Sequence, residues 1–262
     1  MLGGFMVDIK GSARVISAMI ELEVRRVMHD RTELYFRAVQ PLLWLVVFGY
    51  IMSSLRAVPT GNIPYMDFIL PGVIIQSATS VAIFFGLVII WERESGVLKK
   101  LVAAPCPRFA IVVGRAMAAG VRALFQVCII LPFALLVGVK VILNPLYLIT
   151  ALAIVFISAG GFAGLSIWIA SILKSRERFV GIGQVIIFPL FFASNALYPI
   201  ASMPPILQWF STINPMTYMV SASRALLITG DLSSLGIDIA AILVFDLAIF
   251  WLASRDFRQV IN

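Results

Sequence analysis

Few side chains in this 262-residue chain have the types and spacing that catalysis requires. The single histidine, His29, lies in a charged segment and is expected to be a surface residue, and neither a CxxC pair nor an HExxH zinc motif occurs. A phosphate-binding loop places a lysine directly after a glycine, and no lysine in this chain follows a glycine. We therefore expect no catalytic residue, no metal site, no cofactor and no nucleotide site in this chain.

One acidic residue, Asp246, lies near the middle of a long apolar stretch at residues 235–253. Acidic residues inside a membrane are costly and often functional. If Asp246 bound a proton or sodium, the chain would be an ion-coupled secondary transporter, and this stays the alternative function. A structural role, in which Asp246 is neutral or hydrogen-bonded to a neighbouring helix, is favoured because no second acid lies at its depth.

The most distinctive charged segment follows the second apolar stretch and reads WERESGVLKKLVAAP over residues 91–105. It predicts a short amphipathic helix that ends before Pro105, since proline disfavours a helical residue in front of it. Such a helix either lies on lipid or inserts its apolar face into a groove of a partner protein. The apolar residues that share this face are Val97, Leu98, Leu101 and Val102.

The elements around these residues must lie in a membrane. Hydrophobic residues make up 61% of the chain and the mean hydropathy is +1.02, whereas soluble domains contain roughly 45–50% apolar residues. A helical crossing needs about 20 apolar residues. We therefore predict an all-α polytopic membrane protein with six transmembrane helices, at residues 36–55, 68–91, 116–143, 145–173, 179–198 and 235–253.

The start of the third crossing is the least certain boundary, because Arg122 falls near it. An arginine at bilayer depth costs about 2.5–3.5 kcal/mol on insertion scales. The part of this helix in the bilayer is therefore expected to begin near Ala123, with residues 109–122 extending it into the cytoplasm or along the interface.

Lys and Arg gather in the N-terminal segment, in the segments after the second and fourth crossings, and after the last crossing. Because cytoplasmic loops retain positive charge, both termini are expected in the cytoplasm, with the chain a multi-pass protein of the cytoplasmic (plasma) membrane. The net charge of +7 then reflects topology and contact with anionic membrane lipids, and no nucleic-acid partner is expected.

Two further segments are expected to be helical without crossing. Residues 12–35 have apolar residues at helical spacing and predict an interfacial helix, with packing against the protein's own loops as the alternative. Residues 199–233 are apolar but interrupted by prolines, and predict two short re-entrant helices in the outer leaflet. The second helix should begin at Asn214-Pro215 and end at Gly230, since asparagine caps and proline begins a helix.

Two motifs on opposite sides of the predicted membrane resemble one family. The first is Glu92-Arg93-Glu94 with Gly96, Leu98 and Leu101, followed by Pro105 and Gly114-Arg115. The second is residues 196–200, then Met203-Pro204, residues 214–218 and Arg224. Together they resemble the type-2 permeases of ATP-binding-cassette (ABC) exporters, nearest the drug-resistance and nodulation-factor export branch.

This resemblance implies a permease that exports an amphiphilic, drug-like, lipid-like or glycan-like substrate. It also implies a dimer, either a homodimer or a pair with a close paralogue, and two separate ABC ATPase subunits that hold ATP and magnesium. Residues 92–108 would form the coupling loop that transmits ATPase closure to the first, second and fifth crossings. The residues implied in ATPase coupling are Glu92, Arg93, Glu94, Gly96, Leu98, Leu101 and Pro105.

The resemblance further implies a substrate path at the dimer interface, lined by the second and fifth crossings. An aromatic and mildly polar lining would suit an amphiphile. The alternative for each phenylalanine is contact with lipid or with neighbouring helices. The candidate path residues are Gln76, Thr79, Ser80, Phe84, Phe85, Phe188, Phe191, Phe192 and Asn195.

Overall fold

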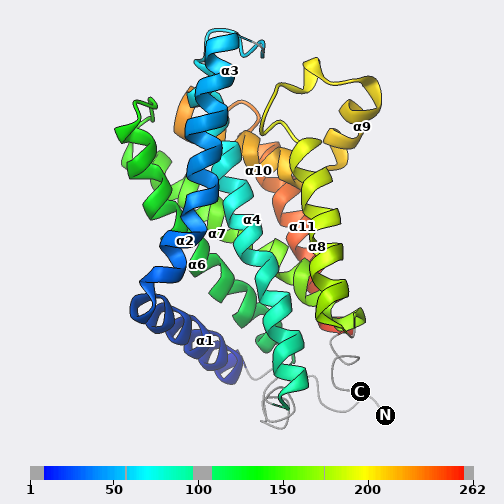
Figure 1. The fold of residues 1–262 in the computed structure, drawn as a ribbon. Helices are drawn as coiled ribbons and strands as arrows, with labels where there is room; N and C mark the ends of the chain where they lie inside the picture. The colour runs from blue at the N-terminus through cyan, green and yellow to red at the C-terminus, as the bar shows by residue number, and fades with distance from the viewer. Residues whose placement is uncertain (1–8, 57, 97–107, 174, 257–262) are drawn as a thin grey trace.

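The computed structural model describes residues 9–56, 58–96, 108–173 and 175–256 (Figure 1). The described residues form helices joined by turns, with no strand among them, and this confirms the all-α expectation. The α-helices are α1 (Ile9–His29), α2 (Arg31–Leu43), α3 (Gly49–Leu55), α4 (Tyr65–Glu94), α6 (Arg108–Leu136), α7 (Pro145–Ile172), α8 (Arg176–Phe192), α9 (Pro205–Ile213), α10 (Pro215–Arg224) and α11 (Leu235–Asp256). Shorter turns of helix are η1 (Trp44–Phe48), η2 (Ile200–Ser202) and η3 (Ala225–Thr229).

Five of the described helical segments are long and apolar enough to cross a membrane, which makes the chain a multi-pass membrane protein. The expected fifth crossing at 179–198 falls on α8, which has 17 residues and ends at Phe192. At 1.5 Å per residue α8 spans about 26 Å, less than the roughly 30 Å of a hydrocarbon core. The five segments are Thr32–Leu55, Tyr65–Glu94, Phe109–Leu136, Pro145–Ile172 and Leu235–Asp256.

Helix α4 is the centre of the bundle and packs against α6, α7 and α8. Its closest contact is with α7, where the backbone N–H of Gly86 donates to Ser166 Oγ at 2.9 Å and that hydroxyl donates to the carbonyl of Ile83 at 2.5 Å. A Cβ on residue 86 would lie 2.2 Å from Ser166 Oγ, so this approach requires glycine.

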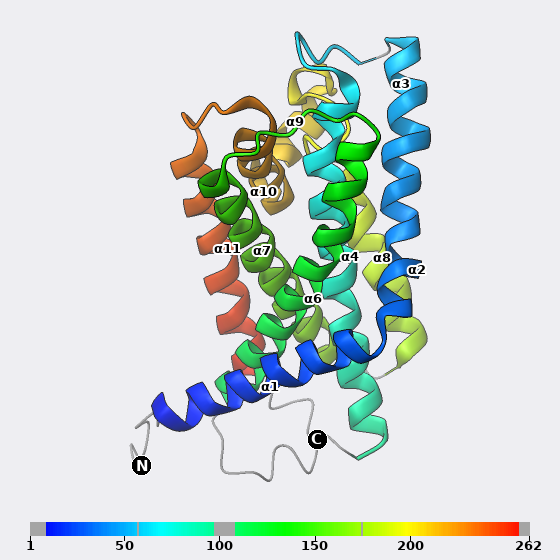
Figure 2. The same cartoon turned by 90° about the vertical axis from the view of Figure 1, so that its left-hand side faces the viewer.

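Helix α1 lies across one end of the bundle, transverse to the long helices (Figure 2). We call this the α1 end, and the opposite end, which carries α9, the α9 end. The expected single helix at 12–35 is wrong, because it is broken at Asp30, whose side chain caps α2 by accepting the N–H of Glu33 at 3.4 Å. Helix α2 then continues through η1 and α3 as one column along the bundle.

Helix α6 ends at Leu136, seven residues before the predicted end of the third crossing at 143. Gly138 has a φ of 95°, which a helix cannot accommodate, and residues 139–144 have no regular secondary structure. This segment bonds to other elements instead. The N–H of Lys140 donates to Asp67 Oδ1 at 3.0 Å, and the N–H of Ile142 donates to the carbonyl of Leu227 at 2.8 Å.

The predicted boundaries of the second short helix near the α9 end are confirmed. Asn214 Oδ1 accepts the N–H of Met216 at 3.0 Å, Pro215 takes the first helical position, and the helix runs through η3 to Gly230, with a φ of 71°. The Asn214 side chain also donates to the carbonyl of Leu190 at 2.7 Å. The cap therefore ties α10 to α8.

Candidate functional site

Three consecutive residues at the α1 end of α4 each bond to a different helix. Glu92 forms an ion pair with Arg115 of α6, and Glu94 forms one with Arg176 of α8. The guanidinium of Arg93 donates to the carbonyl of Leu173, directly after α7, at 3.0 Å. The end of α4 is therefore joined to α6, to α8 and to the residue after α7.

The chain leaves α4 through Gly96, which has a φ of 73° and whose N–H donates to the carbonyl of Arg93 at 3.2 Å. An L-residue side chain is strained in this conformation, so the turn favours glycine. The predicted amphipathic helix after it, with Leu98, Leu101 and Pro105, lies outside the described residues.

A large groove opens at the α1 end between α1, α2, α4 and α6, with a volume of ≈ 1070 Å³. We call it the α1 groove. Phe84 and Phe85, two of the predicted path residues, line it. Arg37 lies over the Phe84 ring, with its Cζ 4.3 Å from the ring centroid. The α1 groove therefore combines aromatic surface with charged side chains.

Arg122, whose position made the third boundary uncertain, lies beside this groove with two carboxylates. Its Nε is 2.5 Å from Glu23 Oε1 and its Nη1 is 3.0 Å from Glu33 Oε1. The cost of placing Arg122 here is offset by these partners on α1 and α2. The sequence analysis missed both glutamates. A signal was available in Glu23, which falls at helical spacing among the apolar residues of α1.

The remaining predicted path residues do not share this groove. Gln76 and Thr79 are buried inside the bundle on α4. Phe188 and Phe192 are exposed on α8 and stack with ring centroids 6.2 Å apart. Phe191 is instead buried and packs edge-on against Trp44, with ring centroids 5.9 Å apart. The backbone carbonyl of Asn195 accepts a hydrogen bond from Arg224.

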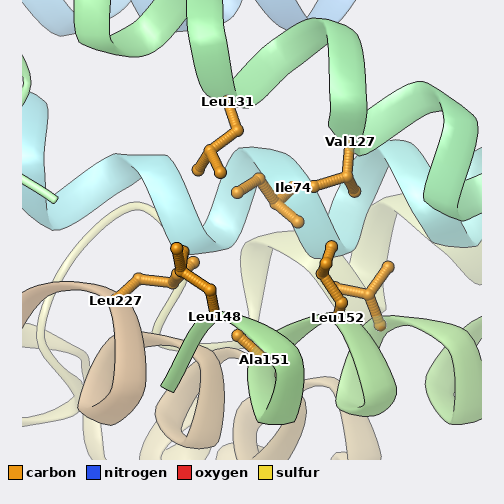
Figure 3. A pocket seen from close by; sticks show the side chains of 8 residues that line it. Ile74, Val127, Leu131, Leu148, Ala151, Leu152 and Leu227 are labelled. Carbon is orange, nitrogen blue, oxygen red and sulfur yellow. The ribbon is translucent and has the colours of Figure 1, made fainter. Parts of the chain in front are cut away.

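A small pocket between α4, α6, α7 and η3 has only apolar side chains around it, as Figure 3 shows. Its volume of ≈ 10 Å³ is at the lower limit for one water molecule, and a water there would find no polar side chain. This pocket is a gap in packing and offers no site for a substrate.

Arg224 joins three elements near the α9 end. Its guanidinium donates to the carbonyl of Phe68 on α4 at 3.2 Å and to the carbonyl of Asn195, after α8, at 2.7 Å. It also lies 3.8 Å from the centroid of the Phe68 ring. Burial lowers the pKa of Arg224 to about 9, so it remains protonated at neutral pH. The sequence analysis placed Arg224 in a motif but gave it no role, and here it clasps α10 to its neighbours.

Asp246 on α11 is buried against α7. A Cβ on Gly161 would lie 1.8 Å from Asp246 Oδ1, and this oxygen has no hydrogen-bond partner in the described part of the chain. Gly161 therefore makes the space that the carboxyl group occupies between the two helices.

Comparison with known proteins gives a consistent result over the greater part of the chain. Residues 14–228, from α1 to η3, match the model of the family described as ABC-2 type transporter. A putative transport permease ycf38 of Cyanophora paradoxa is 32% identical over 192 residues, which are 72% of this chain and 65% of that protein. The match thus spans slightly less than two thirds of that relative.

Two further relatives carry related names. A putative transport permease ycf38 of Pyropia yezoensis is 30% identical over 213 residues, or 80% of this chain and 73% of that protein. A daunorubicin resistance ABC transporter permease protein, DrrB1 of Streptomyces coeruleorubidus, is 23% identical over 199 residues, or 76% of this chain and 70% of that protein.

Proposed function

We propose that this chain, which belongs to the ABC-2 type transporter family, is the membrane permease subunit of an ATP-driven exporter. The resemblance found in the two sequence motifs is confirmed by the family match. We further propose that ATP and magnesium are bound by two copies of a separate ATPase subunit, and that a second permease, identical or closely related, completes the complex.

The observation that carries this function, beyond the family match, is the way the end of α4 is joined to its neighbours. Glu92 bonds to α6, Arg93 to the end of α7 and Glu94 to α8. A coupling loop at 92–108 that an ATPase pulls or rotates would move these helices as a unit. Such a transmission element is what a permease without its own motor requires.

The proposed orientation places the α1 end in the cytoplasm. Helix α1 carries several of the basic residues, and the segments rich in Lys and Arg after α4 and α7 begin at the same end (Figure 1). In this orientation α8 and the turn after it form a short fifth crossing, and α9 and α10 enter the outer leaflet from outside. That arrangement has six crossings with both termini in the cytoplasm.

For the cargo we propose an amphiphilic molecule that passes between two permease copies. The exposed aromatic pair Phe188 and Phe192 on α8 supports a path beside that helix, because large exposed apolar side chains suit contact with lipid-like molecules. Ion coupling through Asp246 is not favoured, since its carboxyl group packs in the space left by Gly161 and contributes to the α7–α11 contact.

The test uses charge exchange at the Glu92–Arg115 pair in proteoliposomes that hold the permease with its ATPase. E92R and R115E should each lower substrate-stimulated ATP hydrolysis by about 5- to 150-fold, the range of coupling free energies of 1–3 kcal/mol. The double variant E92R/R115E restores an ion pair in reverse and should recover most of the stimulation. A Glu92 that contacts the ATPase directly would give no such recovery.

L98D tests whether an ATPase subunit binds at the proposed apolar docking face. A charge at this position would weaken that binding, and no other substitution within the chain is expected to compensate for it. We expect L98D to lose the ATPase on co-purification while the permease stays in the membrane. E21Q removes an exposed pair with Arg25 and should change neither readout. Transport of cargo without ATP, or with an ATPase that cannot hydrolyse ATP, would refute the proposed function.

A further inference from the structure

Three of the four helices around the α1 groove, α1, α4 and α6, each line it with one face, and α2 adds Glu33 and Arg37. On α1 the lining residues recur every three or four positions, the spacing of a single helix face. The same spacing occurs in the lining of α4 and of α6. The principal lining residues of these three faces are Arg14, Ala18, Leu22 and Arg26 on α1; Phe84, Val88 and Trp91 on α4; and Ile111, Arg115, Ala118 and Arg122 on α6.

The two ends of the α1 groove differ in charge. Arg14 and Arg115 line one end, and the carboxylate among the described lining residues there is Glu92, which pairs with Arg115. Within the described part of the chain no carboxylate lies within 4.0 Å of Arg14, whose side chain is exposed. Among the described residues, this end, which we call the Arg14 end, therefore carries more positive than negative charge.

The opposite end is balanced. Its arginines are matched by an equal number of acidic side chains on α1 and α2, and the ion pairs of Arg122 and Arg37 both include Glu33. Arg26 lies on this side, 12 residues and therefore about 18 Å along α1 from Arg14. The charged residues of this end are Arg26, Arg37, Arg122, Glu23, Asp30 and Glu33.

The large apolar side chains of the α1 groove are partly uncovered, and one of them, Phe84, also lies beneath Arg37 of the balanced end. Leu22 is 68% exposed, Trp91 is 53% exposed and Phe84 is 42% exposed, although all three line a concave surface. Trp91 and Phe84 are seven residues apart on α4, about 10.5 Å along its axis. A tryptophan of this kind is typical of the membrane interface, and in the proposed orientation Phe84 would lie at the depth of the acyl chains.

We propose that the α1 groove binds an acidic phospholipid of the inner leaflet, with its phosphate at Arg14 and an acyl chain along Leu22 and Phe84. The excess positive charge at one end and the apolar wall beside it match the two parts of such a lipid. The groove's volume, slightly above the 300–1,000 Å³ of common ligand sites, has room for an amphiphile. Its location in the inner leaflet rests on the proposed orientation, but the lipid need not be the cargo.

The experiment measures lipid contact, so its outcome does not depend on transport. The full chain is placed in phosphatidylcholine vesicles with a small fraction of phosphatidylglycerol that carries a photoreactive acyl chain, and labelled peptides are identified after irradiation. We expect label on the α4 peptide that contains Phe84 and Trp91. Photoreactive phosphatidylcholine at the same fraction should label this peptide several-fold less, because it carries no net negative charge.

Two variants on the same helix face provide the matched comparison. R14Q should lower labelling by phosphatidylglycerol by about fivefold, as expected for one basic residue near a membrane surface. R14K keeps the charge and should retain the labelling by phosphatidylglycerol. R26Q, at the balanced end, should change this labelling by less than about twofold. Equal labelling by both lipids, or equal losses in R14Q and R26Q, would overturn the proposal. So would absence of label from the Phe84–Trp91 peptide.

Discussion

Replacing Arg122 with alanine should be one of the most destabilising single changes at the α1 end. The Arg122 side chain is 12% exposed and its partner Glu23 is 7% exposed. Without the guanidinium, the Glu23 carboxylate would remain buried with no cation from the described residues within ion-pair distance. Removing one partner of a buried ion pair costs about 3–5 kcal/mol.

Helix α1, which carries the partner Glu23, offers a control. Arg25 pairs with Glu21 at 2.7 Å, a distance similar to that of the Arg122 pair, but these side chains are 76% and 63% exposed. An exposed pair of this kind contributes about 1 kcal/mol or less. R25A should therefore leave the stability almost unchanged, although the distance between its charged groups alone would predict a similar loss.

Thermal unfolding of the detergent-purified chain, followed by tryptophan fluorescence, measures the difference. At about 2–4 °C per kcal/mol for a protein of this size, R122A should lower the midpoint by about 6–20 °C and R25A by less than about 4 °C. The double variant R122A/E23Q removes the stranded charge as well and should recover part of the loss, which a double-mutant cycle detects. Equal shifts for R122A and R25A, or no recovery with E23Q, would refute the assignment of this stability to a buried charge pair.

Two further predictions concern the α9 end. G72A should lower the yield of monodisperse protein in size-exclusion chromatography, because its Cβ would lie 2.7 Å from the backbone oxygen of Ala196, whereas G181A meets no atom within 4 Å and should behave as the native chain. R224Q should lower the unfolding free energy by about 1.5–3 kcal/mol, the contribution of hydrogen bonds to a charged group, and R224K should recover part of it. An unchanged unfolding midpoint in R224Q would contradict the role of Arg224 as a clasp between α10 and α4.

Local signals in the sequence predicted several elements well. The apolar stretch predicted at 145–173 corresponds to α7 at Pro145–Ile172, and that at 235–253 corresponds to α11 at Leu235–Asp256. Asn214-Pro215 and Gly230 marked the limits of a short helix correctly. These features depend on hydrophobicity and backbone conformation within a few neighbouring residues, which the sequence displays directly.

Other features could not be predicted because they depend on residues far apart in the chain. Helix α6 ends at Leu136, and the backbone N–H groups of the segment after it donate to the Asp67 side chain and to the carbonyl of Leu227. The predicted path residues were chosen by residue type and by the helices expected to carry them. The structure separates them into the α1 groove, the buried face of α4, the exposed face of α8, and the contacts that Phe191 and Asn195 make with Trp44 and Arg224.

By itself the sequence determined that this chain is helical, that it crosses a membrane several times and that it is an ABC-type permease. Long apolar stretches need a bilayer, and the residues of each motif lie close together along the chain, so both features can be recognised in the sequence alone. Only the tertiary structure decided which charges inside that bundle have partners. Arg122 meets Glu23 and Glu33 across 99 and 89 residues of sequence, because α1 and α2 fold back onto α6. The sequence shows which residues are charged, whereas the free-energy cost of burying each charge depends on the partners that tertiary packing places beside it.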